Sequence, residues 1–275
     1  MVTAAAASWG AWSLVVRPTH LPSTVTTPII FLVMGLVALP LALRGPAMVW
    51  DRTTIGLIVA NAVFDAVNLL AFFAALATTT VAIAVLTHYL APVLVALAAP
   101  RIDRVVVRGA GPAAGVALVG LAIILEPWQA PADGAVLGAL LGLGSARCYA
   151  GTLLTARRLA IRIGAPRALA YHALVAGVVI APLLVGHLGA ITAHDLAWLG
   201  GGAATIGAVS GLVFTVGLTR IGSARTAVLT FIEPIVAVSL GAVVWHEPLH
   251  PIAVLGGALV LGAGIHVARK ARQPT

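Results

Sequence analysis

Three residues near the end of the chain stand in an order that binds zinc in one class of peptidases. The stretch WHEPLH, residues 245–250, contains His246, Glu247 and His250 in the pattern H-E-x-x-H. In such a site two histidines one helical turn apart bind the metal, and the glutamate acts as general base. The site needs an unbroken helical turn, so the helices around the motif decide whether it can form.

The composition is that of a membrane protein. Of the 275 residues, 61% are hydrophobic and 9% are charged, whereas a soluble domain carries about 25% charged residues. Apolar runs of about 20 residues, each enough to cross a bilayer, alternate with short polar breaks. We expect all-α structure with ten transmembrane helices, near residues 2–17, 27–44, 54–75, 80–99, 110–126, 133–156, 168–187, 195–218, 223–244 and 251–268.

The arginines and lysines set the expected orientation. Ten spans place both termini on one side, and the connections on that side hold 14 of the 16 basic residues. Basic loops stay in the cytoplasm, so we expect a multi-pass protein of the inner (cytoplasmic) membrane with cytoplasmic N- and C-termini. Because topology accounts for the net charge of +8, no nucleic-acid partner is expected.

The chain also repeats itself. A shift of 142 residues places Pro92 on Pro234, and it places Gly115 and Gly120 on Gly257 and Gly262. This predicts two five-helix units, residues 1–130 and 131–275. Since five is an odd number, the units must cross the bilayer in opposite orientations, as in the inverted repeats of secondary transporters.

These features resemble the EamA-type transporters of the drug/metabolite transporter (DMT) superfamily. The residues that carry the resemblance are Trp9-Gly10, the prolines Pro92 and Pro234, and the W-x-E-P-L ending at Trp245 to Leu249. The resemblance implies a ten-helix exporter of amino acids or other metabolites that works without cofactors. It also implies that the glutamate of WHEPLH belongs to a loop and binds no metal.

The proline of WHEPLH favours the same interpretation. Pro248 stands between the two histidines, where it suits the first turn of a new helix but not a helix interior. We therefore expect residues 245–250 to connect two spans. An intramembrane metalloenzyme that uses His246, Glu247 and His250 is the alternative from a different class of function.

Two of the eight acidic residues fall inside spans, where ionisable groups are costly and often mark a transport pathway. They are Asp65 and Glu233. Asp65 belongs to a stripe with Asn61, Asn68 and Phe72, whose spacing places all four on one helix face. The stripe should face a wet cavity or a partner helix; the alternative is a buried pair or hydrogen bonds that only join helices.

Symmetry-related prolines loosen the fourth and ninth spans. Pro92 follows His88 by four residues and Pro234 follows Thr230 by four, so each proline removes the hydrogen bond to that carbonyl. We expect freed carbonyls at His88 and Thr230, with the prolines as gating hinges. His88 joins Asp65 and Glu233 as a candidate proton carrier, although it could equally be a satisfied core histidine.

The remaining predicted site residues are one arginine and several aromatic side chains. Arg147 falls mid-span and needs an anionic ligand or an internal pair with Asp65 or Glu233. An aromatic wall of the cavity is expected from Trp9, Trp12, Tyr89, Tyr149 and Phe214. For the tryptophans, interfacial anchoring is the alternative.

Together these residues predict a secondary transporter rather than an enzyme. No G-x-x-x-x-G-K-[ST] stretch is present, so ATP drive from this chain is not expected. The small-molecule substrate is expected to be an amino acid or related zwitterion, with its amine near an acid and its carboxylate near Arg147, exchanged for protons. An organic cation is the alternative. One chain suffices for the cavity, so a monomer can work and a dimer is possible.

Overall fold

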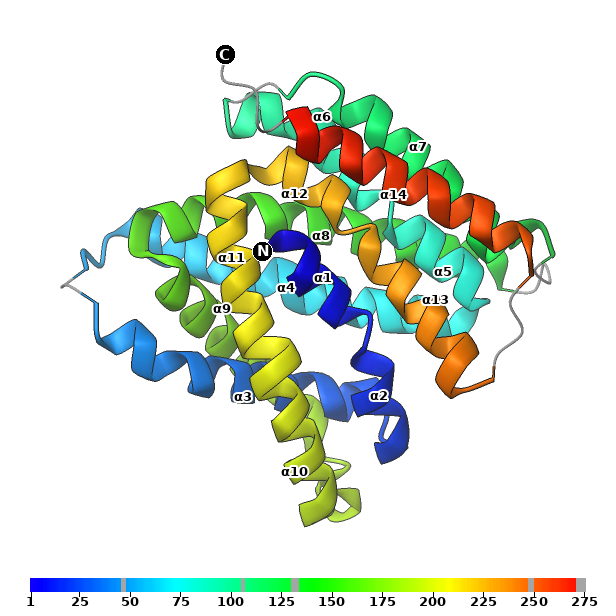
Figure 1. The fold of residues 1–275 in the computed structure, drawn as a ribbon. Helices are drawn as coiled ribbons and strands as arrows, with labels where there is room; N and C mark the ends of the chain where they lie inside the picture. Colours follow the sequence, from blue (N-terminus) through cyan, green and yellow to red (C-terminus); the bar gives the residue numbers. More distant parts are fainter. Residues whose placement is uncertain (46–47, 105–106, 130–133, 247–249, 271–275) are drawn as a thin grey trace.

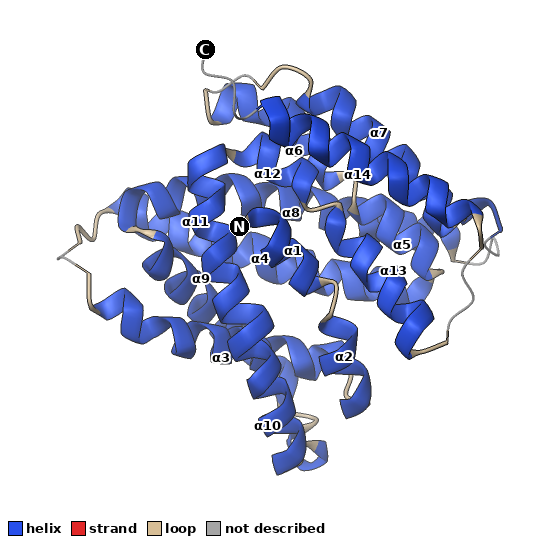
Figure 2. Cartoon of the chain, viewed as in Figure 1, coloured by secondary structure: helices blue, strands red, loops and turns tan. Residues whose placement is uncertain are grey.

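The computed structural model describes residues 1–45, 48–104, 107–129, 134–246 and 250–270 (Figure 1). These residues form helices, turns and loops, with no strand among them (Figure 2). Nine helical segments in the described ranges are long and apolar enough to cross a membrane. The prediction of an all-α integral membrane protein is therefore confirmed.

The helices follow the predicted order, with some spans built from two pieces. They are α1 (Val2–Trp9), α2 (Trp12–Val16), α3 (Ser23–Leu43), α4 (Arg52–Thr78), α5 (Val81–His88), α6 (Ala91–Ile102), α7 (Ala110–Leu125), α8 (Ala135–Ile163), α9 (Ala165–Ile180), α10 (Ala193–Gly202), α11 (Ser210–Ile221), α12 (Ser223–Leu229), α13 (Ile232–Val244) and α14 (Ile252–Lys270). The first predicted span, 2–17, is not one continuous helix, because α1 ends before Gly10 and α2 follows it.

The fourth and ninth predicted spans are each interrupted near their proline. Tyr89 and Leu90 separate α5 from α6, and Thr230 and Phe231 separate α12 from α13. The prolines lie in the first turn of the second piece, where a missing N–H leaves no intrahelical bond unmade. One expectation is wrong: the Thr230 carbonyl is not free, because it accepts a hydrogen bond from the Glu233 N–H at 3.0 Å.

The eighth span contains a π-helical turn, which the sequence did not indicate. Residues Ala203–Val209 adopt this wider turn between α10 and α11. The Trp9 indole N–H donates to the Ile206 carbonyl at 3.1 Å, and the Ser8 and Ser210 hydroxyls are 2.7 Å apart. The wide turn thus supplies an acceptor that joins α1 to this span.

Long-range packing pairs helices from the two halves of the sequence. Helix α3 packs along α9, α4 along α8, and α7 along α14. Helices α7 and α14 lie side by side in Figure 1. Between α7 and α14 the backbones touch: a Cβ added at Gly120 would lie 2.6 Å from the Gly256 carbonyl oxygen. Such close helix approach is what small residues permit inside a membrane.

Replacing Gly256 by alanine should lower the thermal-unfolding midpoint in detergent. The new methyl group would meet the Gly120 backbone, which has no flexible end to move aside, and overpacking of this kind costs about 1–3 kcal/mol. Its neighbour Gly257 faces open space, so Gly257→Ala is the matched control and should leave the midpoint unchanged or raise it. Equal midpoints for the two variants would contradict the tight α7–α14 contact.

Candidate functional site

Polar and aromatic side chains from five helices and one helix break meet in the middle of the bundle. We call this set the central cluster. It contains Asp65 and Asn68 of α4, His88 of α5 with Tyr89 after it, Ser145 and Tyr149 of α8, His172 of α9, and Glu233 of α13. Six of these eight residues are predicted site residues, and they lie far apart in the sequence.

Glu233 lies in the first turn of α13, half-buried, at a helix N-terminus that favours a negative charge. The Tyr89 and Tyr149 phenols both interact with its carboxyl group. Among the described residues, no arginine, lysine or histidine forms an ion pair with it. The carboxylate therefore lies beside two phenols and has no countercharge from the part of the chain that the structure describes.

Aromatic rings enclose His88 on three sides. Its ring lies 4.5 Å from the Phe72 ring, 5.1 Å from Tyr89 and 5.1 Å from Tyr149, measured between centroids, and it stacks on Tyr149 at 19°. Tyr89 in turn lies 5.6 Å from Phe231. Rings packed beside a carboxylate form the kind of surface that binds an ammonium group.

A chain of hydrogen bonds joins α4, α5 and α8 beside these rings. The Ser145 hydroxyl donates to the Asn68 side-chain oxygen at 2.8 Å and lies 2.7 Å from His88 Nδ1. About two helical turns away along α4 and α8, the Asn61 amide donates to the Thr152 carbonyl and the Thr155 hydroxyl, both at 2.9 Å. Both asparagines of the predicted stripe are thus engaged with α8.

Asp65, the acid of the same stripe, pairs with a residue that was not predicted. Its Oδ2 lies 3.2 Å from Nε2 of His172, in the middle of α9. The expected alternatives for Arg147, a pair with Asp65 or with Glu233, are not found among the described residues. Arg147 is exposed, and it stands two positions, about 200° of helix rotation, from both Ser145 and Tyr149. It does not join the central cluster.

The predicted aromatic wall divides into two parts. Trp9 packs on Phe214 with ring centroids 4.5 Å apart, and Trp9 and Tyr149 both border the same hydrophobic cluster as Phe214. Trp12 lies after the break in the first span and packs with Val15, Val25 and Leu199 instead. Trp9 and Phe214 therefore border the site region, whereas Trp12 lies apart.

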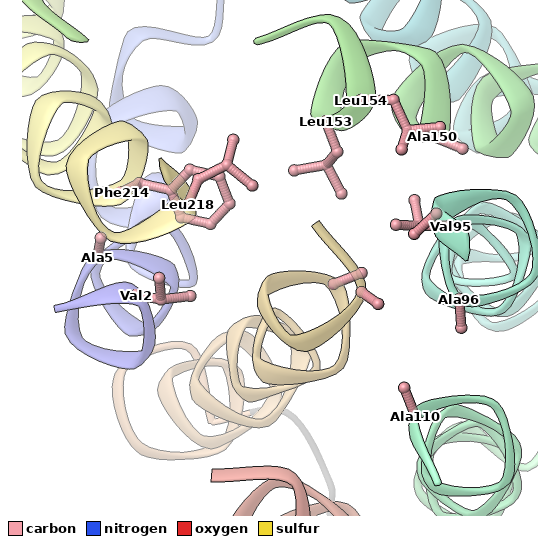
Figure 3. Packing of buried hydrophobic residues seen from close by; sticks show 13 residues of the cluster. Val2, Ala5, Val95, Ala96, Ala110, Ala150, Leu153, Leu154, Phe214 and Leu218 are labelled. Carbon is pink, nitrogen blue, oxygen red and sulfur yellow. The ribbon is translucent and has the colours of Figure 1, made fainter. Parts of the chain in front are cut away.

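A cluster of buried apolar side chains, which we call the hydrophobic plug, lies between the central cluster and the end of the bundle that holds Arg101 and Arg157. We call this end the arginine-rich end. Along α6 and α8 the residues of the plug fall between the site residues and the arginines: Val95 and Ala99 precede Arg101, and Leu153 precedes Arg157. Figure 3 shows Leu153 facing Leu218 and Phe214 of α11, with Val95 on another side. Phe214, Leu218, Val95 and Leu153 are all buried, so side chains close this end.

Beyond the plug, one buried acid connects three helices. Asp103 follows α6, and its side chain is 1% exposed. Its Oδ1 lies 3.4 Å from a guanidinium nitrogen of Arg157 on α8, and its Oδ2 accepts from the Ser223 N–H of α12 at 3.3 Å. We call Asp103, Arg157 and Ser223 the latch.

The WHEPLH stretch lies between α13, which ends at Val244, and α14, which begins at Ile252. His246 and His250 are exposed, and His250 Nδ1 lies 3.2 Å from Glu126. Glu247 is outside the described residues. In the ranges that are described, no three His, Cys, Asp or Glu side chains gather as a metal site. Helix α13 thus ends before this stretch and α14 begins after it, as expected for a connection, while residues 247–249 lie outside the described ranges.

Sequence reasoning missed two members of the cluster. His172 is a histidine inside an apolar run, and the rule that flagged the intramembrane acids applies to it as well. Ser145 carried no comparable signal, because serine is common in membrane helices as a link between neighbours.

Comparison with known proteins relates this helical membrane protein to transporters. The model of the EamA-like transporter family matches residues 136–268. An uncharacterized transporter of Archaeoglobus fulgidus is 29% identical over 236 residues, which cover 85% of this chain and 82% of that protein. One crystal structure superposes with a TM-score of 0.80 at 18% identity, covering 99% of this chain and 97% of the other, which shows a shared fold.

A relative with a named substrate is more distant. The threonine/homoserine exporter RhtA of Salmonella typhimurium is 27% identical over 203 residues, and the match covers 70% of this chain and 64% of RhtA. By these matches the chain is similar to transporters of the EamA type in the drug/metabolite transporter superfamily, and its long apolar helices make it a multi-pass membrane protein.

Proposed function

We propose that this chain exports small metabolites carrying a cationic amine, most notably amino acids and related zwitterions, in exchange for protons. The observation that carries the proposal is Glu233, a half-buried carboxylate that faces phenol rings and has no ion-pair partner in the described chain. An ammonium group would supply the missing charge and would lie against the rings of Tyr89 and Tyr149. The named activity of RhtA points to the same class of substrate.

Arg147 bears on the second substrate candidate. Arg147 was expected to bind a substrate carboxylate. Its side chain is exposed and lies on the opposite side of α8 from Ser145 and Tyr149, so it cannot do so in the central cluster. Recognition in the cluster then depends on the amine, which favours organic cations as an alternative to amino acids.

Uptake into proteoliposomes tests both candidates. The panel holds threonine, homoserine, an amine without a carboxylate, and the corresponding acid without an amine. We expect transport of the amino acids or of the amine, and none of the amine-free acid. Transport of the amine-free acid at a similar rate would refute recognition through Glu233.

We propose further that residues 1–130 and 131–275 are inverted repeats that alternate access to the site. Equivalent helices pack together, α3 with α9 and α7 with α14, and both α5–α6 and α12–α13 are interrupted. The family match lies within the second unit. In this proposal the protein lies in the inner membrane, and its termini and arginine-rich end face the cytoplasm. The plug and the latch then close the site to the cytoplasm.

The latch gives a direct test of alternating access. Asp103→Ala leaves the Arg157 charge buried without its partner, and breaking such a pair costs about 3–5 kcal/mol. We expect the closed state to lose population and Leu153→Cys, in a Cys148→Ser background, to react at least about tenfold faster with a thiol reagent.

The matched control is Asp51→Ala. Asp51 pairs with Arg162 at the same end of the molecule, but both side chains are exposed, and such pairs contribute little. Labelling of Leu153→Cys should stay near its original rate in this variant. A rate unaffected by Asp103→Ala would contradict the role of the latch.

A further inference from the structure

The pair of Asp65 and His172 links two spans at mid-membrane. Asp65 is the fourteenth residue of the 27-residue α4, and His172 is the eighth of the 16-residue α9. Their side chains are 18% and 10% exposed, so both are largely shielded. Two ionisable groups at this depth are costly unless they compensate each other.

The hydrogen bonds of His172 restrict where its protons can be. Nδ1 lies 2.9 Å from the Ala168 carbonyl oxygen, which can only accept, so Nδ1 carries a hydrogen. Nε2 then faces Asp65 Oδ2 at 3.2 Å. With one proton between them the contact is attractive, either as imidazolium and carboxylate or as imidazole and carboxylic acid. Without it, a lone pair of the ring faces a carboxylate, and the contact is repulsive.

The pair therefore has two states that differ by one proton and by the attraction between α4 and α9. Proton uptake draws the two helices together, and proton release loosens them. This is what a coupling site needs, because protonation must bias a movement of one helix against another.

The other buried histidine, His88, is held differently. The Ser145 hydroxyl donates to Asn68, so it can only accept from His88 Nδ1. No carboxylate contacts His88 among the described residues, and three aromatic rings surround it. His88 thus shapes the aromatic surface, and the described part of the chain offers it no acid with which to share a proton.

Tyr149 is a titratable side chain that interacts with both acids. It is within electrostatic range of both Asp65 and Glu233. Of the helices packed against α4 and α9, α8 contributes Tyr149 and α5 contributes His88 as titratable groups, and α3 places the Phe31 ring 6.5 Å from His172.

We infer that the Asp65–His172 pair is the proton-exchange site of this transporter, and that Glu233 is left to bind the substrate amine. The inference rests on the proposed function and divides the work between two acids that the sequence treated alike. In the exchange the two sites are occupied in turn: the Nε2–Oδ2 contact carries a proton across the membrane in one direction, and Glu233 carries the amine in the other.

Two transport modes in proteoliposomes distinguish the roles. Counterflow at equal pH exchanges substrate for substrate and needs no net proton movement, whereas accumulation driven by a pH gradient does. We expect Asp65→Asn and His172→Gln to keep counterflow within about threefold of wild type, and to lose at least about 90% of gradient-driven accumulation. Glu233→Gln should lose both. The controls His194→Gln, on an exposed ring, and Glu126→Gln, outside the cluster, should lose neither.

Asp65→Glu, which restores a carboxylate, should recover part of the gradient-driven transport, and it carries the test if Asp65→Asn does not fold. Loss of counterflow in both His172→Gln and Asp65→Glu would overturn the inference, and so would gradient-driven transport that survives in Asp65→Asn and His172→Gln. Absence of amine counterflow in the wild type would instead refute the proposed function itself.

Discussion

Replacing Glu233 by glutamine should weaken binding of amine substrates by about 10- to 100-fold. A hydrogen bond to a charged group contributes about 1.5–3 kcal/mol, and each 1.4 kcal/mol is a factor of ten in the dissociation constant. The carboxylate has no cationic partner among the described residues. Its removal therefore deprives the substrate amine of a negative charge and leaves no described cation of the protein unpaired. The fold should therefore survive the change.

Ligand-dependent thermal unfolding measures this effect in detergent. A ligand at 100 times its dissociation constant stabilises the protein by about 2.7 kcal/mol, and the same concentration should add little to Glu233→Gln. The matched control, Glu126→Gln, makes the same chemical change near the end of α7, where the acid faces His250. It should keep the ligand-induced shift. A full shift in Glu233→Gln would show that the amine binds elsewhere.

Much of the architecture could be predicted because its causes are local. The length of the apolar runs determines the number of spans. Pro92 and Pro234 lack a backbone N–H whatever the packing around them, so the helix breaks beside them could be predicted from the sequence. Pro248 likewise excluded a helix through WHEPLH. The spacing of Asn61, Asp65 and Asn68 set a common face, and all three side chains indeed contact neighbouring helices.

The partners of those side chains could not be predicted, because they depend on which helices meet. Asp65 had Arg147 as its obvious candidate, yet α9 places His172 beside it while Arg147 points away from the cluster. The rotation of α8 contained a clue: Ser145 and Tyr149 share a face that excludes residue 147. No proline accompanies the helix break after Trp9. The separation of Trp9 from Trp12 therefore could not be predicted in the way that the breaks near Pro92 and Pro234 could.

That break brings Gly10 against the backbone that carries Glu233. A Cβ at residue 10 would lie 2.6 Å from the Glu233 carbonyl oxygen, 2.7 Å from Val236 Cβ and 3.0 Å from the Ala237 nitrogen. Two of these atoms are backbone and cannot turn aside. A larger side chain must therefore push α1 away from α13 and move the carboxylate relative to its tyrosines.

Gly10→Val should consequently reduce transport at least about tenfold, since a displacement near 1 Å in a binding site can cost about 100-fold in rate. Its thermal midpoint should also fall, in keeping with an overpacking cost of about 1–3 kcal/mol. Gly144→Ala is the control: it lies on α8 close to Ser145, but an added Cβ there meets nothing within 4 Å. Substrate uptake and unfolding of both variants decide the matter, and a Gly10→Val protein with normal uptake would mean that the position of Glu233 does not depend on α1.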